Sequence, residues 1–321
     1  MEDVVVASDL VGCRYRLVQR RAHPEMPRTH ASIARAERHA AAVEAVMQML
    51  PRRGSGRFRR IDLEGDEWER SMRTLEAVVS GYTHITNAVF ATEEWMVHVD
   101  VLLREGDKYT PIIVSNHRVA RKNDTKTTLA VPTHRLGLSE PLEAPYKLRH
   151  HAVDGYRLAF AARALQDLGL DSGRGGAIGQ DRTRAFFTDT ARFDLERAWN
   201  QPLPTAPVRV KECASCRFWS LCEPELVAAD DISLFLSGDR AKPYRERGIT
   251  SVQALIDADL GEPSRLAAAW RAGEVLLRRG DVNVPRADVE VDVDMEAYLD
   301  QGAYLWLSLI HISEPTRPLY I

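Results

Sequence analysis

Three of the four cysteines in this chain of 321 residues fall within ten residues of one another. Cys213, Cys216 and Cys222 follow the spacing C-x2-C-x5-C, and Cys13 lies 200 residues upstream. Four thiolates satisfy one tetrahedral zinc ion or one iron-sulfur cluster. Structural zinc sites usually combine two close cysteine pairs, whereas these ligands divide three plus one. Two disulfides are disfavoured without a secretion signal, and unrelated buried cysteines are the alternative to a metal site.

Carboxylates and a histidine form a second set of candidate catalytic residues. Asp100 lies in the apolar run HVDVLL, where a buried carboxylate is costly without a partner or a metal ion. His39 borders the apolar stripe of its helix, so a core histidine is as good an interpretation as a ligand. The segment 288–296 alternates acidic and apolar residues. Asp294 and Glu296 have the spacing that binds two metal ions in some nucleases, although a solvated strand face explains the pattern equally well.

Helices and strands must position these residues. Apolar residues at helical spacing predict helices over 31–50, 66–80 and 146–168. In the second helix they form the stripe Trp68, Met72, Leu75 and Val79.

After the second helix, the apolar residues no longer follow helical spacing and instead form short β-rich runs. The runs NAVFAT, WMVHVDVLLR and TPIIVSNHRV predict an antiparallel sheet, and AIGQDRTRAFFTD predicts a returning strand pair. A turn centred on Gly106-Asp107 would place Asp100 opposite Ile113 and His98 opposite Ser115.

Length and composition set the broad class of the protein. At 36.1 kDa the chain predicts about two domains, and its mean hydropathy of -0.30 excludes a disordered chain. Since it has no apolar run of membrane-spanning length and no signal peptide, we expect a cytoplasmic protein without a membrane partner. The formal charge of -3 means that nucleic-acid binding would need local basic patches.

The three-plus-one cysteines resemble those of the RecB-like iron-sulfur nucleases, a branch of the PD-(D/E)XK superfamily that includes AddB and CRISPR-associated exonucleases. In that family one cysteine near the start of the nuclease domain and three near its end bind a 4Fe-4S cluster, which joins the two ends. The resemblance covers roughly residues 8–225 and implies that Cys13, Cys213, Cys216 and Cys222 are the cluster ligands.

The same resemblance assigns roles to the carboxylate and the histidine. In these nucleases an Asp on one strand, a Glu on its hairpin partner and a His on the preceding helix bind Mg²⁺ or Mn²⁺, and a Lys two residues after the Glu supports the attacking water. Asp100 and His39 match the Asp and the His. Ile113 and Ser115 stand where the Glu and the Lys are expected. Arg157 and Ala161 stand at the positions of the Gln-and-Tyr motif that the family carries on the following helix, so this first site is degenerate.

The rest of the chain resembles two further modules. Residues 231–260 are similar to a helix-hairpin-helix module, although generic small helices fit equally well. Asp294 and Glu296 resemble the first metal ligands of a DEDD-type exonuclease with a ribonuclease H-like fold. Only 15 residues follow Trp306, and they resemble a translated sequencing-adapter tail; a short natural tail is the alternative.

The sequence therefore predicts an α/β protein with a restriction-endonuclease-like core, closed by a 4Fe-4S cluster, over residues 1–225. This core is followed by a helical module over 226–282, a truncated ribonuclease H-like strand over 283–306 and a non-native tail over 307–321. The expected function is that of a RecB-like, Mg²⁺- or Mn²⁺-dependent DNA exonuclease with a weakened first site, acting on single-stranded DNA or DNA ends. The alternatives are an inactive iron-sulfur DNA-binding or scaffold module and a zinc-stapled regulatory protein.

Overall fold

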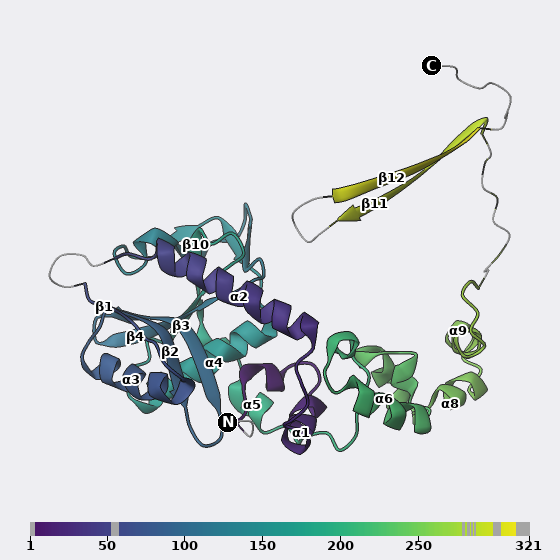
Figure 1. Ribbon diagram of the computed structural model, residues 1–321, viewed down its shortest axis with the longest axis horizontal. Coiled ribbons are helices and arrows are strands. Elements are labelled where there is room, and N and C mark those ends of the chain that lie inside the picture. The colour runs from purple at the N-terminus through teal and green to yellow at the C-terminus, as the bar shows by residue number, and fades with distance from the viewer. Residues whose placement is uncertain are drawn as a thin grey trace. The chain divides into compact units, whose positions relative to one another are not determined.

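The protein folds as two compact units, Met1–Ala267 and Ala268–Ile321. A computed structural model describes residues 4–52, 58–277, 280, 283, 285, 287–297 and 303–312. The first unit is an α/β fold built on a large mixed sheet (Figure 1), which confirms the predicted class. The predicted division at residues 225 and 282 stays a prediction.

The described helices are α1 Tyr15–Ala22, α2 His30–Met49, α3 Glu67–Val79, α4 Ala152–Asp167, α5 Leu195–Trp199, α6 Trp219–Ala228, α7 Lys242–Arg245, α8 Val252–Asp257 and α9 Glu262–Arg271. The described strands are β1 Arg60–Asp62, β2 His84–Ala91, β3 Met96–Glu105, β4 Lys108–Val114, β5 Ala120–Lys122, β6 Thr128–Pro132, β7 Leu142–Ala144, β8 Tyr146–Leu148, β9 Arg174–Ile178, β10 Arg184–Asp189, β11 Val289–Ala297 and β12 Ala303–Ile312.

The main sheet has eight strands in the order β1-β2-β3-β4-β9-β10-β6-β7. The pairs β1/β2 and β4/β9 are parallel, and the other pairs are antiparallel. Glu105 pairs with Lys108 around the Gly106-Asp107 turn, and Val101 pairs with Ile112. Continued by one residue, this register places Asp100 opposite Ile113, as the turn predicted.

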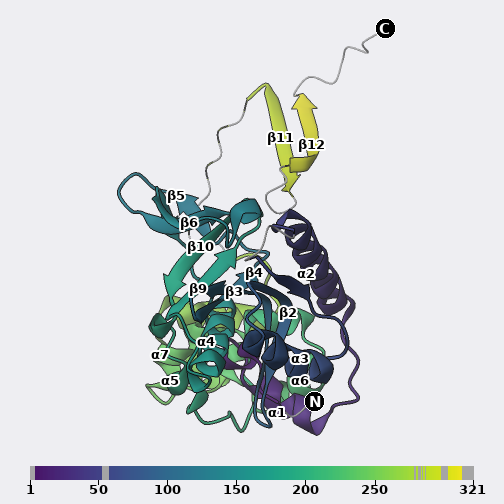
Figure 2. The ribbon, with the colours of Figure 1, turned by 90° about the vertical axis from the view of Figure 1, so that its left-hand side faces the viewer.

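Helices cover both faces of this sheet (Figures 1 and 2). On one face Val46 of α2 and Leu50, directly after this helix, pack in a core cluster with Val101, Ile112 and Phe187. On the other face α3 and α4 pack on a second cluster, whose large side chains include Ile85, Leu102, Tyr109, Phe160 and Leu165. The sheet is therefore the middle of three layers, and its central strands are buried on both sides.

The helix α3 begins where the sequence predicts. Asp66 caps it by accepting a hydrogen bond from the backbone N–H of Glu69, whose side chain accepts one in return. The predicted apolar stripe nevertheless faces outward: the exposed side chains are Trp68, Met72, Leu75 and Val79. Because α3 packs on the sheet through the smaller side chains of Ala77 and Val78, the larger apolar residues remain on the outer side.

The helix predicted over 146–168 is wrong at its start. Residues Tyr146–Leu148 form β8, which pairs antiparallel with β5 in a separate two-stranded ribbon, and α4 begins only at Ala152. Tyr146 turns inward onto Phe186, with ring centroids 5.0 Å apart. This burial against the sheet favours the extended conformation at the first residues of the predicted helix.

Small helices follow the sheet, and Ile232, Ala241, Val252 and Leu255 are buried in their own core cluster. In the second unit β11 and β12 form an antiparallel hairpin. This hairpin includes residues 307–312 of the predicted non-native tail, whereas 313–321 lie outside the described residues. Across the described residues, no helix combines the length and the apolarity needed to cross a bilayer.

Candidate functional site

The candidate site lies where the ladder between β2 and β3 is interrupted. Thr86 pairs with Val101 and Ala88 with Val99, but the residues between them, Asn87 and Asp100, do not pair. Asn87 has a positive φ of 55°, a conformation that asparagine tolerates better than most residues. The register is the same on both sides of this position, so Asp100 keeps its place on β3 without a ladder partner on β2.

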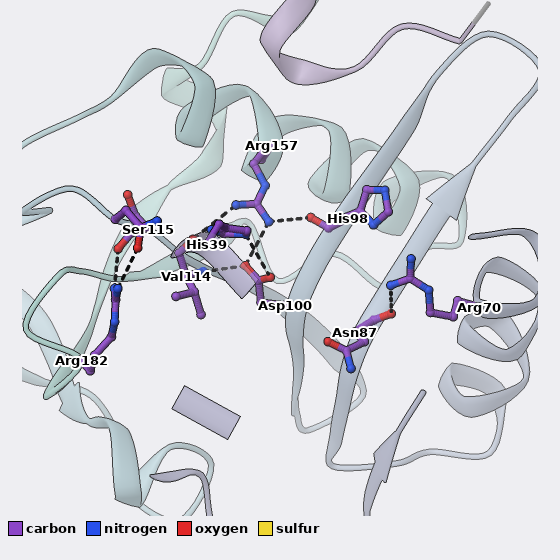
Figure 3. Close-up of polar contacts among 10 residues, drawn as sticks. His39, Arg70, Asn87, His98, Asp100, Val114, Ser115, Arg157 and Arg182 are labelled. Carbon is purple, nitrogen blue, oxygen red and sulfur yellow. Dashed lines mark hydrogen bonds and ion pairs between the residues drawn. The ribbon is translucent and has the colours of Figure 1, made fainter. Parts of the chain in front are cut away.

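Asp100 is almost fully buried and is bound by two donors (Figure 3). Its Oδ2 accepts a hydrogen bond of 2.6 Å from the backbone N–H of Val114 on β4. The same atom accepts a hydrogen bond of 3.0 Å from Nη2 of Arg157 on α4. Arg157 also donates to the carbonyl oxygens of His98 and Val114, at 3.1 and 3.4 Å. The guanidinium group is thus fixed next to the carboxylate and compensates its charge.

The structure brings His39 and Asp100 together, although 61 residues separate them in sequence. Nε2 of His39 on α2 lies 4.0 Å from Oδ1 of Asp100, which is beyond hydrogen-bond distance. Burial lowers the pKa of His39, and Asp100 only partly opposes this effect. The pair therefore joins a carboxylate to a histidine that favours its neutral form.

A second histidine–carboxylate pair lies near the same site. Nε2 of His98 on β3 is 3.0 Å from Oε1 of Glu67 at the start of α3. Burial lowers the pKa of His98 despite the opposing effect of Glu67. This pair attaches α3 to the strand that carries Asp100.

The strand β4 and the loop after it carry no carboxylate or lysine at the predicted positions. Ile113 is fully buried, and Ser115 donates a hydrogen bond of 2.6 Å to Oδ2 of Asp154 on α4. Arg182 donates to the carbonyl oxygens of Ser115 and Gly179, at 2.7 and 2.8 Å. These contacts fix the loop after β4, and the acidic group near the site is Asp154 of α4, which acts on His39, and not a residue of β4.

The cysteines lie where the amino-terminal segment meets residues 198–222. Gln19 on α1 donates to Sγ of Cys222 on α6 at 3.8 Å. Burial raises the pKa of Cys13, Cys213 and Cys222, the last to about 12, and the thiols of Cys213 and Cys216 add to the rise for Cys13. The four cysteines form no disulfide, and burial favours the neutral thiol form of Cys13, Cys213 and Cys222.

The predicted cofactors are contradicted by this arrangement. The part of the chain that the structure describes contains no group of three or more His, Cys, Asp or Glu side chains that could hold a metal ion. The 4Fe-4S cluster expected on the four cysteines and the Mg²⁺ or Mn²⁺ expected at His39 and Asp100 are therefore wrong. The Asp100 carboxylate is already paired with Arg157.

Asp294 and Glu296 lie in the second unit, on β11. They pair with Leu307 and Leu305 of β12 and are exposed. Oδ1 of Asp294 accepts a hydrogen bond from the backbone N–H of Met295. Within the described residues they belong to no group of three or more potential metal ligands, and their role as site residues stays a prediction.

Two residues of the site have roles that the sequence did not predict. In the sequence, Arg157 is only a departure from the motif of the nuclease family. In the structure, it is the side-chain partner of Asp100. Asn87 gave no signal, because its role is a backbone conformation inside a strand. The sequence feature from which a partner for Asp100 could have been predicted is the basic residue Arg157 in the next helix.

Comparison of the chain with models of known protein families, with curated proteins and with solved structures gives no match. Its function is therefore inferred from its own geometry.

Proposed function

We propose that the protein is a RecB-like DNA-binding protein of repair or recombination, whose first nuclease site no longer hydrolyses DNA. The observation that carries this proposal is the ion pair between Asp100 and Arg157. The guanidinium group of Arg157 compensates the charge of the carboxylate that a nuclease of this type would use.

The position of the site supports the RecB-like assignment. The resemblance implies a His from the helix before the sheet and an Asp on the first strand of a hairpin. His39 on α2 and Asp100 on β3 meet at 4.0 Å, and the partner strand β4 follows through the Gly106-Asp107 turn. Two residues that are 61 positions apart in sequence need not lie close together. Their proximity therefore favours an architecture shared with the RecB-like nucleases.

The contacts of the site favour loss of hydrolysis. A nuclease of this type needs a second carboxylate and a lysine on the partner strand, and Ile113 and Ser115 supply neither. Arg157 is held by two backbone carbonyl oxygens as well as by Asp100. Displacing it would leave a charge and two acceptors unpaired in a partly buried site, which is costly.

The same contacts make the site compatible with a bound phosphate backbone. An unpaired Asp100 would repel phosphates, but its charge is compensated by Arg157. Arg182 lies on the neighbouring loop. Since phosphate contacts supply most of the affinity of non-specific DNA binding, removing a local negative charge favours binding even where catalysis is lost.

Binding and cleavage must be measured together to test this proposal. Labelled single-stranded and duplex DNA are titrated with the protein and followed by fluorescence anisotropy, and the same mixtures with Mg²⁺ or Mn²⁺ are resolved on denaturing gels. We expect salt-sensitive binding without cleavage above background. Asp100→Asn, which keeps the size and an acceptor oxygen, leaves that background unchanged.

The matched control is Asp167→Asn, which removes the same charge from the exposed pair of Asp167 with Arg163 on α4. Cleavage by the wild-type protein that is lost in Asp100→Asn but kept in Asp167→Asn would show a live first site and overturn the loss of hydrolysis. Absence of binding to either DNA at low salt would overturn the DNA-binding function itself.

A further inference from the structure

The two-stranded ribbon of β5 and β8 carries an unusual concentration of positive charge. Residues 118–126 and 146–150 contain six Lys and Arg against one Asp, in a chain whose net formal charge is -3. We define the basic ribbon by its exposed cations Arg121, Lys122, Lys126, Lys147 and Arg149. The opposite sign of the local and overall charge makes this ribbon a separate electrostatic feature of the surface.

Two of these cations lie directly opposite each other. In the antiparallel register of the ribbon, Arg121 on β5 pairs with Lys147 on β8, and both side chains are exposed. Directly opposed like charges destabilise a strand pair by a few tenths of a kcal/mol to about 1 kcal/mol. An anion between or above the two side chains would remove this repulsion.

The inner face of the ribbon offsets that cost. Ala120 is buried, and Tyr146 and Leu148 pack with it in a small core cluster that includes Phe186. This packing holds the ribbon against the sheet and leaves Arg121 and Lys147 on the outer side. Arg121 and Lys147 are therefore held on the outer side by the packing of the inner face.

The cations of the ribbon have no acidic partner among the residues that the structure describes. Within the described part of the chain, none of the five side chains of the basic ribbon forms a salt bridge. Asp124 is the nearest acidic residue in sequence and is exposed, while Asn123 fixes the loop by accepting hydrogen bonds from the backbone N–H and the hydroxyl of Thr125. The positive charge is thus available to a partner.

The ribbon is directly connected to the candidate site. β4 ends at Val114, which binds Asp100, and β5 follows at Ala120; β8 leads into α4, which carries Arg157. The rings of His117 and His151 stack at 3.8 Å where these two connections meet. Figure 2 shows β5 beside β6 and β10 at the upper end of the first unit. A partner on the ribbon would therefore lie next to the site of the proposed function.

We propose that the basic ribbon binds the phosphate backbone of duplex DNA, an inference that rests on the proposed DNA-binding function. Proteins that bind single strands combine positive charge with aromatic side chains on which bases stack. The aromatic residue of the ribbon strands, Tyr146, is turned inward onto Phe186, so the outer face offers charge without a stacking platform. Such a surface recognises phosphates and not bases, and its binding is independent of DNA sequence.

The test compares wild-type protein with the double variant Arg121→Ala/Lys147→Ala on a duplex at several salt concentrations. Each lost phosphate contact reduces the slope of log K against log salt by about 0.9, so we expect a slope smaller by about 2 and binding about tenfold or more weaker at about 100 mM salt. The thermal midpoint should be equal or higher, because the like-charge repulsion is removed.

The matched control is Arg197→Ala/Lys211→Ala, which removes the same charge from exposed positions outside the ribbon. Equal losses in both double variants would mean a general charge effect and overturn the assignment of the ribbon. Unchanged duplex binding in the ribbon variant, or loss of single-strand binding alone, would also overturn it while leaving the proposed function intact. Failure of the wild-type protein to bind any DNA would instead overturn the proposed function.

Discussion

Arg157 on α4 and Asp100 on β3 form an ion pair at 3.0 Å, with only 15 and 8 % of the two side chains exposed. This contact joins the helix to the strand at the point where the β2–β3 ladder is interrupted. It fixes Asp100 more firmly than His39 does, because the histidine lies at 4.0 Å. The pair therefore has a structural consequence that can be measured independently of DNA.

We predict that Asp100→Ala destabilises the protein by about 3–5 kcal/mol, because it leaves a buried guanidinium group without its counter-charge. The double variant Asp100→Ala/Arg157→Met should recover part of this loss, since it removes both charges. Urea denaturation gives the free energies of unfolding. The control Asp167→Ala, in an exposed pair with Arg163, should cost less than about 1 kcal/mol. Equal costs for Asp100→Ala and Asp167→Ala would contradict the prediction.

We predict that stability falls as the pH decreases from about 6.5 to about 4, because of His84. Burial lowers the pKa of this histidine from 6.5 to about 4. The unfolded chain binds a proton in this range while the folded protein does not, so His84 contributes its full stability above pH 6.5 and loses it as the pH falls. A shift of this size corresponds to about 3 kcal/mol.

Replacing this histidine tests its contribution directly. His84→Leu should flatten the dependence of the unfolding free energy on pH, leaving a smaller fall from His39 and His98, whose pKa values are also lowered by burial. His134→Leu, at an exposed position, is the matched control. An undiminished fall in His84→Leu would show that other groups cause it.

We predict that Gly137→Ala destabilises the protein more than Gly106→Ala does. Both glycines have positive φ angles, 73° and 66°, so an alanine at either position should cost about 1–2 kcal/mol through the backbone. At Gly137 an added Cβ would also lie 2.4 Å from Cε1 of His84 and 2.7 Å from Cδ1 of Leu103, whereas at Gly106 no described atom lies within 4 Å. The resulting crowding should add about 1–3 kcal/mol.

The comparison of these two glycine variants separates packing from backbone strain. Both are measured by urea denaturation against the wild-type protein at a pH near 8, where His84 is neutral in both states. A larger loss for Gly137→Ala confirms that the chain passes close to His84 at this position. Equal losses would mean that His84 and Leu103 move aside at little cost.

Local patterns in the sequence determined several parts of this protein. The turn at Gly106-Asp107 set the register of β3 and β4, because a hairpin turn fixes the pairing on both sides of it. Asp66 determined the start of α3 through a cap that involves only its own first turn. The absence of a carboxylate and a lysine opposite Asp100 also followed from this register.

Contacts between distant segments decided the rest. The partner of Asp100 is Arg157, and the extended conformation of Tyr146–Leu148 depends on pairing with β5. The cysteine spacing suggested a metal cluster, but among the described residues the fold forms no group of three or more side chains that could hold a metal ion. In each case the outcome depends on which groups from elsewhere in the chain surround a residue, and the free energy of burial or pairing that they supply outweighs the local preference.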